Sequence, residues 1–421
     1  GYLPTVQNLI KCLNNSLSEI GYKDCEYEIK PISSGASNFT TILFEVTVSH
    51  PGKDALHLFA KTATIGEKFR EQMNADVIYD NEYRFYKKLV QVYNQLYDNN
   101  KVPKEDRIVF SKFYGGTLES GAEVLVLEDL SKTKFTLFDR MKPLDWEHAA
   151  VSIKDLAKFH ALGFALKKEH PDIYEEFDNN KHYQETFAKI QPQFVKMITE
   201  SLELIDPEYR SRIGALLSNE ELMMQFMTNS VGSGHHTLIH GDFRTSNMMF
   251  KRQGGKLVCV LVDFQTMRSG NIFQDIMYLI TVNTDVKFRK YHWDQIMSYY
   301  YTELTKSLRQ LGLDETGVYP KEAFDQDLKL SLPMGVIIGV MTTPIVLVDT
   351  EVAPDMSGDD VGIESFKVPA SETCRIRMND LVLVYNIEKN RQSPRDQCER
   401  ACTRKAISCV HRKKFSYVIK I

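Results

Sequence analysis

The first 130 residues alternate short apolar runs with polar breaks, which is the pattern of β-strands separated by turns. Two runs stand at 40–48 (TTILFEVTV) and 57–63 (HLFAKTA), and two more fall within 107–130. Between these pairs, Asp80–Val90 has the spacing of a helix with an apolar stripe of Tyr83, Phe85, Tyr86 and Leu89. We therefore predict a small antiparallel sheet that carries one helix.

After Trp146 the pattern changes to long amphipathic stretches, such as 148–166, whose apolar positions recur at helical spacing. One interruption, at 237–265, has the pattern of two short strands around a polar loop. We predict an α+β protein of two lobes that share one interface. The sheet lobe spans 1–128, and the larger, mainly helical lobe spans 129–387.

The longest charge-free run, 330–348, has about the length of a membrane span. Two prolines, two glycines and two threonines interrupt it, so we expect a buried core helix rather than a span. The first 17 residues mix Asn, Gln and Lys among their apolar positions, so we expect no secretory signal there. Membrane association is therefore not expected.

Composition is that of a globular protein: 421 residues are 43% hydrophobic, with a formal net charge of −4. That balance gives no general attraction to nucleic acid or anionic lipid, and we expect neither as a partner. The exception is 388–421, where ten Lys or Arg face three acids, a charge of +7 against −11 elsewhere. Four of the seven cysteines lie from Cys374 onward, and the body has the few cysteines of a reduced, cytoplasmic protein.

Candidate chemistry is concentrated in the polar loop, where Asp242 and Asn247 stand five residues apart in HGDFRTSN. Sixteen residues after Asn247, and following an apolar run, Asp263 opens the sequence DFQ. A hairpin between the two motifs would bring Asn247 and Asp263 together as oxygen ligands that suit Mg²⁺. We interpret His240, which begins the loop, as a brace in preference to a ligand. This spacing is typical of phosphoryl transfer.

Lys61 could supply the positive charge that binds the phosphates. It stands inside an apolar strand, so its ammonium group must either reach solvent or pair with an acidic partner. Glu82, on the predicted helix, could pair with Lys61 and aim its ammonium at the α- and β-phosphates. Glu67 and Glu71 compete for the same role, and Glu82 could also be a solvated surface residue.

Two further segments are candidates for nucleotide contacts. Gly35, Ser37 and Asn38 form a small-residue turn ahead of the first long strand, where backbone N–H groups could cover phosphates, although such a turn is also a common hairpin connection. Glu128 and Asp129 follow the last strand, at the change from β to α character. Their backbone could bond an adenine edge, and a plain connector between the lobes is compatible with that role.

Four segments resemble the ecdysteroid kinase-like proteins of arthropods, relatives of choline and aminoglycoside kinases. They are VLVLEDL at 124–130, LAKFHALG at 156–163, LIHGDFRTSNMMF at 238–250 and LVDFQTMRSGNIFQDIMYLI at 261–280. The resemblance implies a two-lobed protein-kinase-like fold, ATP and Mg²⁺ as cofactors, and a small hydroxylated acceptor such as an ecdysteroid or a xenobiotic. It also implies that Asp242 is the catalytic base, Asn247 and Asp263 the metal ligands, and Lys61 with Glu82 the phosphate-positioning pair.

The segment 388–421 departs from that family. Cys398, Cys402, Cys409 and His411 fit no paired zinc knuckle. We interpret the segment as a read-through, mis-spliced or disordered extension, in preference to a metal site or a polybasic partner-binding tail.

The sequence bears on three possible functions of the whole chain. The intact set of Lys61, Asp242, Asn247 and Asp263 favours an active small-molecule kinase. A protein kinase is disfavoured because no G-x-G-x-x-G loop precedes Lys61 and no A-P-E follows DFQ. A catalytically silent protein that binds a small hydrophobic ligand on the same scaffold is the alternative, and consumption of ATP discriminates it.

Overall fold

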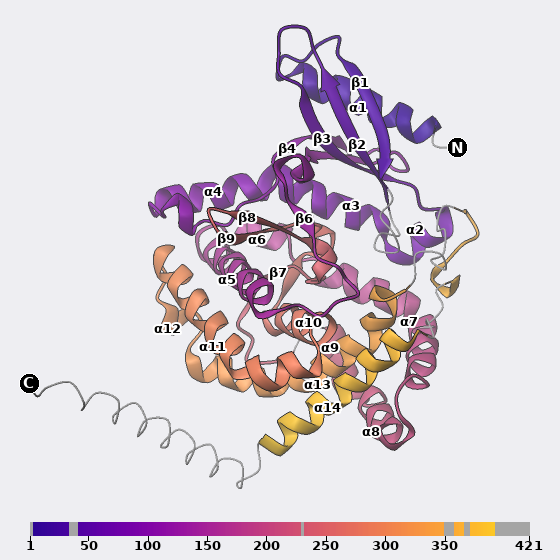
Figure 1. Cartoon of the computed structure of the whole chain (residues 1–421), viewed down its shortest axis with the longest axis vertical. Coiled ribbons are helices and arrows are strands. Elements are labelled where there is room, and N and C mark those ends of the chain that lie inside the picture. The colour runs from indigo at the N-terminus through magenta and orange to yellow at the C-terminus, as the bar shows by residue number, and fades with distance from the viewer. Residues whose placement is uncertain (1–2, 33–40, 229–230, 349–357, 366–370, 392–421) are drawn as a thin grey trace, which may run out of the picture.

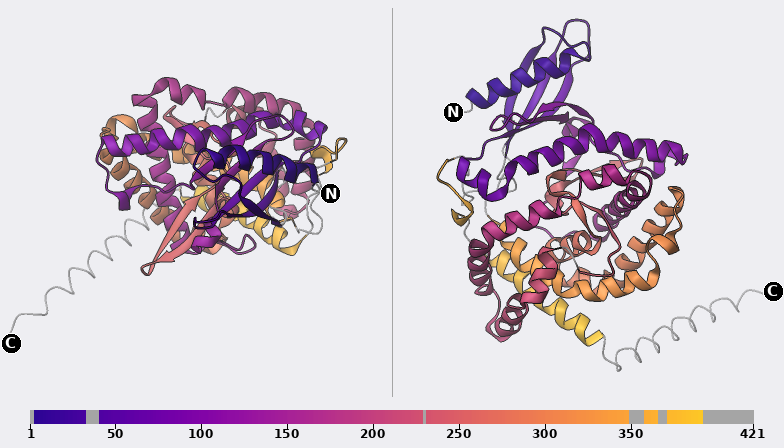
Figure 2. Two further views of the ribbon diagram at one scale, coloured as in Figure 1. Left: turned by 90° about the horizontal axis from the view of Figure 1, so that it is seen from above. Right: turned by 180° about the vertical axis from the view of Figure 1, so that it is seen from behind.

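The computed structural model describes residues 3–32, 41–228, 231–348, 358–365 and 371–391. A sheet lobe stands above a larger helical lobe, which confirms the predicted α+β class and two-lobed arrangement (Figure 1). The view from behind shows the same division, with the sheet on one end of the helical body (Figure 2, right). The Gly35, Ser37 and Asn38 turn and most of the 388–421 segment lie outside the described residues.

The sheet of the upper lobe is antiparallel throughout, with strand order β1-β2-β3-β5-β4. Its strands are β1 (Glu26–Ile32), β2 (Thr41–Ser49), β3 (Leu56–Ala63), β4 (Phe113–Thr117) and β5 (Val124–Glu128). The four runs that we predicted correspond to β2–β5, whereas β1 was not predicted. The boundary proposed after residue 128 falls at the end of β5.

One face of the sheet is covered by α1 (Leu3–Ser18), a helix that the prediction did not contain. Its buried side chains recur at three- and four-residue spacing and pack against Phe44, Val46, Leu58 and Val126; they are Leu9, Cys12, Leu13 and Leu17. Polar residues between them obscured this stripe in the sequence. Because side chains alternate along a strand, Lys61 projects from the opposite face, toward the lower lobe.

A long helical run passes beneath that second face of the sheet (Figure 1). It consists of α2 (Glu67–Met73), α3 (Ala75–Arg84), a π-helical turn (Phe85–Leu89) and α4 (Val90–Asn99). The predicted helix at 80–90 is thus the middle of a longer run. The π-helical turn widens the helix at the point where Phe85 and Tyr86 enter the core.

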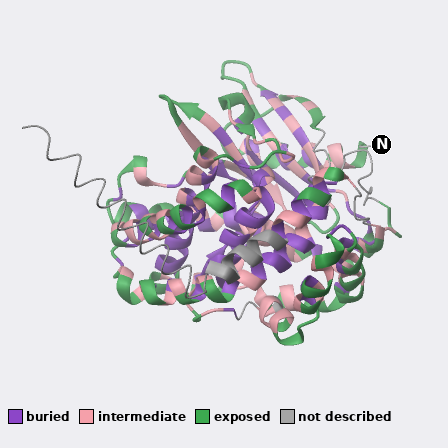
Figure 3. Ribbon diagram, turned by 60° about the horizontal axis from the view of Figure 1, so that its bottom comes forward, coloured by how far each residue is buried: buried purple, intermediate pink, exposed green. Residues whose placement is uncertain are grey.

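The lower lobe is built on α5 (Trp146–Glu169), packed against α11 (Val286–Gln310), and on α10 (Phe273–Asn283), packed against α13 (Lys321–Val346). Its centre is the main apolar core, seen as the buried interior of the helical body (Figure 3). The remaining helices are α6 (Pro171–Glu176), α7 (Asn180–Leu202), α8 (Pro207–Leu217), α9 (Glu220–Met227), α12 (Glu315–Val318) and α14 (Glu372–Arg391).

The charge-free run at 330–348 lies largely in α13, which packs on α10 and α14. Among the described residues, one helical stretch, Glu315–Val346, is long and apolar enough to cross a membrane, with a mean hydropathy of 1.5. Of the 18 consecutive residues that form its apolar part, 67% are buried inside the protein. This burial agrees with the expected core helix.

Short strands in the lower lobe hold the polar loops. The hairpin of β8 (Met248–Gln253) and β9 (Lys256–Leu261) pairs with β6 (Thr136–Leu137), and β7 (His236–Ile239) pairs with β10 (Arg268–Asn271). The HGD loop connects β7 to β8, and the DFQ segment connects β9 to β10. Both loops therefore emerge side by side beneath the sheet lobe.

Candidate active site

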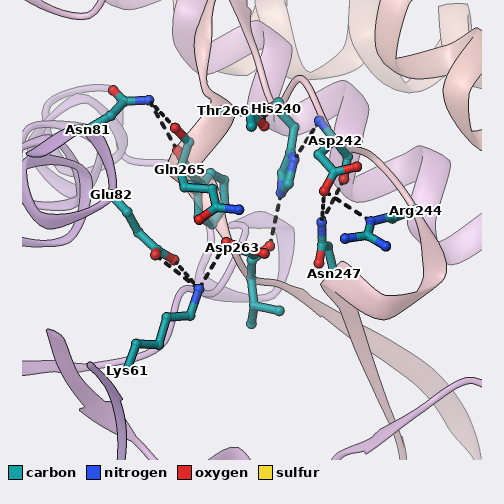
Figure 4. A network of polar contacts seen from close by, with 12 residues as sticks. Lys61, Asn81, Glu82, His240, Asp242, Arg244, Asn247, Asp263, Gln265 and Thr266 are labelled. Atoms are coloured by element: carbon teal, nitrogen blue, oxygen red, sulfur yellow. Dashed lines mark hydrogen bonds and ion pairs between the residues drawn. The ribbon is translucent and has the colours of Figure 1, made fainter. Parts of the chain in front are cut away.

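Lys61 lies between two carboxylates at the interface of the lobes (Figure 4). Its Nζ is 2.9 and 3.0 Å from the two carboxylate oxygens of Glu82, and 2.9 Å from Oδ1 of Asp263. Glu67 and Glu71 are exposed on α2. The structure therefore selects Glu82 as the partner of Lys61, as predicted, and adds Asp263 as a second partner.

The pKa values in this cluster are shifted because two buried carboxylates share one cation. Burial lowers the pKa of Lys61, but the Asp263 and Glu82 carboxylates outweigh burial and hold the pKa above its usual range. Burial raises the pKa of Glu82 to about 7, against the attraction of Lys61 and with added repulsion from Asp263. The cluster thus holds more negative charge than Lys61 can neutralise, which suits a site that receives a metal cation.

The β8–β9 hairpin brings Asn247 and Asp263 together, as the sequence predicts. Met248 pairs with Leu261, and the backbone N–H of Val262 donates to the carbonyl of Asn247 over 3.0 Å. Asp263 adopts the left-handed conformation, with φ 69° and ψ 63°, which is uncommon for a residue with a side chain. This turn separates the Asp263 carboxylate, directed at Lys61, from the Phe264 ring, which is buried in the core.

Asp242 is held by Arg244 and Asn247 from its own loop. Arg244 Nε lies 3.0 Å from Asp242 Oδ2, and Asn247 Nδ2 lies 2.9 Å from the same oxygen and 2.8 Å from the Asp242 carbonyl. Burial raises the pKa of Asp242, but Arg244 and a hydrogen bond from Tyr278 outweigh it and hold the pKa below its usual range. Asp242 is therefore an ionised carboxylate at neutral pH.

The donor set fits Mg²⁺. With its Nδ2 committed to Asp242, Asn247 has its amide oxygen left for a cation, and Asp263 has Oδ2 outside the bond to Lys61. Within the described ranges, no three His, Cys, Asp or Glu side chains gather as a metal cage. Two protein oxygens are nevertheless enough for Mg²⁺, which keeps waters and takes its remaining ligands from phosphate groups.

Asp275, on α10, braces the HGD loop and was not predicted to do so. Its carboxylate accepts the backbone N–H groups of His240 (2.7 Å) and Gly241 (2.8 Å) and contacts Nε2 of His160 (3.1 Å). His240 also places Nε2 3.0 Å from the carbonyl of Val262, which links the HGD loop to the DFQ segment. His240 is thus the brace that the sequence suggested.

Gly241 is required by this geometry. Its φ is +84°, a region that side chains rarely adopt, and an added Cβ would stand 2.4 Å from both the Thr266 carbonyl and the Arg268 guanidinium. The backbone beside Asp242 therefore leaves no room for a side chain between it and the Thr266 carbonyl.

Hydrogen bonds within the protein limit which groups of Glu128 and Asp129 could bind adenine. The backbone N–H of Glu128 donates to Lys112 over 2.9 Å, and that of Asp129 donates to His57 over 3.1 Å. The Asp129 carboxylate accepts from the backbone N–H and the hydroxyl of Ser131. Both amides are used within the protein, so adenine recognition by this segment would rely on carbonyl groups or on the following residues, and it stays a prediction.

Arg268 follows the DFQ segment, and its guanidinium lies over the ring of Tyr183, 4.5 Å from the ring centroid. Its guanidinium donates to the Thr266 carbonyl and to the Gln274 side chain. Met267 and Phe273, on either side of Arg268 in the sequence, are fully buried and belong to the core. Tyr183, from α7, is the aromatic residue at this position, and nothing in its sequence neighbourhood indicated that.

With this geometry established, comparison with known proteins gives a family. A model of the ecdysteroid kinase-like family matches residues 35–313, which includes every predicted catalytic and metal-binding residue. The chain belongs to the ecdysteroid kinase-like family. The resemblance noted in the sequence is therefore confirmed, and no curated protein matches the chain.

Several solved structures are similar to this ecdysteroid kinase-like protein. A microcompartment-associated aminopropanol kinase is 9% identical, with a TM-score of 0.33, and the match covers 79% of this chain and 98% of the kinase. An aminoglycoside phosphotransferase from Streptomyces rimosus, in complex with ADP and streptomycin, is 10% identical, with a TM-score of 0.34 and coverage of 80% and 99%.

Proposed function

We propose that this protein transfers the γ-phosphoryl group of ATP, in the presence of Mg²⁺, to a hydroxyl group of a small molecule. The observation that carries the proposal is the joint placement of the Lys61–Glu82–Asp263 cluster and the Asp242–Asn247 pair on neighbouring loops. Family membership supports an ecdysteroid or a hydroxylated xenobiotic as the acceptor. Consumption of ATP separates this proposal from a silent binding protein.

Each residue has a defined task in the proposed reaction. Lys61, held by Glu82, binds the α- and β-phosphates, and Asn247 and Asp263 would hold the metal. Mg²⁺, when bound, supplies positive charge to the phosphate oxygens. As the acceptor oxygen bonds to the γ-phosphorus and the bond to the β–γ bridging oxygen breaks, the acceptor proton passes to Asp242, whose Oδ2 remains held by Arg244 and Asn247.

The state of Asp242 agrees with that role. A pKa below the usual range makes the carboxylate a weak base in the ground state, so it accepts the proton as the acceptor oxygen loses electron density to phosphorus. Arg244 and Asn247 also fix the carboxylate, which limits the motion needed to reach the transition state.

The test uses a panel of ecdysteroids and hydroxylated plant compounds incubated with the protein, ATP and Mg²⁺, followed by mass spectrometry. We expect a phosphate mass increase on at least one compound. Asp242→Asn should lower the rate by about a hundredfold to ten-thousandfold while nucleotide binding is kept, because the carboxylate acts on the acceptor proton. Asp139→Asn, an exchange of the same kind at an exposed position, is the matched control.

Two results would contradict the proposal. Undiminished turnover by Asp242→Asn would exclude Asp242 as the base. Absence of Mg·ATP binding by the unmodified protein would favour the silent binding protein on the same scaffold.

A further inference from the structure

Asn81 precedes Glu82 on α3, and its side chain enters the loop that follows Asp263 (Figure 4). Asn81 is 1% exposed. Its Nδ2 lies 3.3, 3.1 and 2.8 Å from the backbone carbonyl oxygens of Phe264, Gln265 and Met267. Carbonyl oxygens only accept hydrogen bonds, so the NH2 group of this amide, with its two N–H donors, must face them, and the orientation of the amide is determined by its neighbours.

The oxygen of the same amide is fixed from the lower lobe. Asn179, which is also buried, donates its Nδ2 to Asn81 Oδ1 over 2.9 Å and to the Met267 carbonyl over 3.3 Å. Asn81 thus has partners on both ends of its side chain. A fully satisfied polar network of this kind holds one arrangement, since any rotation leaves buried groups without partners.

These contacts form a closed series of interactions through the candidate active site. Glu82 contacts Lys61, Lys61 contacts Asp263, and the loop after Asp263 returns to Asn81, the neighbour of Glu82. The aromatic side chain of Phe264 adds a second attachment, because it stacks on Phe85 of the same helical run. The two ring centroids are 3.7 Å apart and the ring planes are inclined by 15°. One helix therefore holds both the partner of the phosphate-binding lysine and the loop of the metal ligand.

The conformation of Asp263 explains why such an attachment is needed. A non-glycine residue in the left-handed region is held there against a conformational cost, so its surroundings must supply the constraint. The carbonyls bound by Asn81 belong to the residue directly after Asp263 and to two residues just beyond it. Without these bonds the turn is free to relax and carry the carboxylate away from its position.

We propose that Asn81 is a positioning residue, which holds the DFQ loop so that Asp263 presents its carboxylate to the metal of a bound nucleotide. The inference rests on the proposed function, because it assigns Asp263 to that metal. Asn81 itself contacts neither metal nor nucleotide. A side chain with a purely structural role would affect unfolding but not the affinity for metal.

The experiment compares the unmodified protein with Asn81→Ala in binding of Mn²⁺ with ADP, followed by electron paramagnetic resonance, and of ADP alone in EDTA. Loss of a residue that orients a metal ligand lowers metal affinity by about 10–100-fold in known sites. We expect a loss of that size for Mn²⁺ with ADP and a change of less than about threefold for ADP alone. Thermal unfolding is recorded for each variant.

Asn379→Ala is the matched control, because its amide also joins two segments, donating to the Leu204 carbonyl and accepting the N–H of Asp206 on the far side of the lower lobe. It should lose stability and keep its Mn²⁺ affinity. Should Asn81→Ala fail to fold, Asn179→Ala takes its place, with an expected loss of about three- to tenfold in Mn²⁺ affinity.

An unchanged Mn²⁺ affinity in the variants, or an equal loss of ADP binding with and without metal, would overturn the assignment of Asn81. A failure of the unmodified protein to bind Mn²⁺ with ADP would instead overturn the proposed function, together with the inference that rests on it. The two failures are therefore distinguishable.

Discussion

Replacing Glu82 with glutamine should stabilise the nucleotide-free protein at high pH. Glu82 is buried beside a cation that it shares with Asp263, and its pKa is raised to about 7 from an ordinary value of 4.5. A carboxyl group with a raised pKa in the folded state contributes its full stability below the unfolded pKa, and loses that contribution as pH rises through the folded pKa. The pH window for Glu82 is therefore between about 4.5 and about 7.

The magnitude follows from the same two values. A difference between 7 and 4.5, at about 1.4 kcal/mol for each pH unit, corresponds to about 3 kcal/mol in the free energy of unfolding. Between pH 5 and pH 8 the change is about 2–3 kcal/mol. Glutamine has no charge to desolvate, so Glu82→Gln should gain this amount relative to the unmodified protein on going from pH 5 to pH 8.

Urea unfolding at pH 5 and pH 8 measures the difference, and groups that titrate equally in both proteins cancel from it. Glu71→Gln, the same exchange at an exposed acid on the neighbouring helix, is the control. The reasoning would be refuted by a stability difference between the two proteins that is the same at both pH values. A larger advantage for the unmodified protein at pH 8 would show that the ion pair stabilises the fold.

Two further predictions concern the loops. Asp263→Ala removes a proposed metal ligand, so Mg·ATP binding should weaken by at least about tenfold; a wild-type Mg²⁺ titration would contradict the assignment of Asp263. Gly241→Ala forces a side chain into a left-handed backbone and against the Thr266 carbonyl, so the free energy of unfolding should fall by about 1–3 kcal/mol and turnover should be lost. Retained stability and turnover in that variant would show that the loop can shift.

The expected destabilisation of the nucleotide-free protein by Glu82 has a functional explanation. Buried ion pairs are weak evidence for stability, since desolvation offsets attraction. In this cluster the excess negative charge is balanced when a cation binds beside Asp263, so the cost belongs to the empty state. Stability and metal binding are thus expected to oppose one another at this position.

Several local features could be predicted from the sequence. Strands β2–β5, the helical lower lobe and the buried run at 330–348 follow from the period of their apolar residues. The approach of Asn247 to Asp263 was also predictable, because a short hairpin joins them and its ends must meet. Helix α1 and strand β1 were missed because polar residues interrupt their apolar positions.

The sequence by itself determined which residue types are available for phosphoryl transfer and in what order, since local spacing carries that information. Only the tertiary structure decided which buried polar groups meet: Asp263 with Lys61, Asp275 with the HGD loop, and Asn81 with the loop after Asp263. A single Asn or Asp in a helix has no local signal for its partner, because its hydrogen bonds are made to residues far away in the chain. Packing of the two lobes brings those partners within reach, and the desolvation of unpaired groups makes the pairing specific.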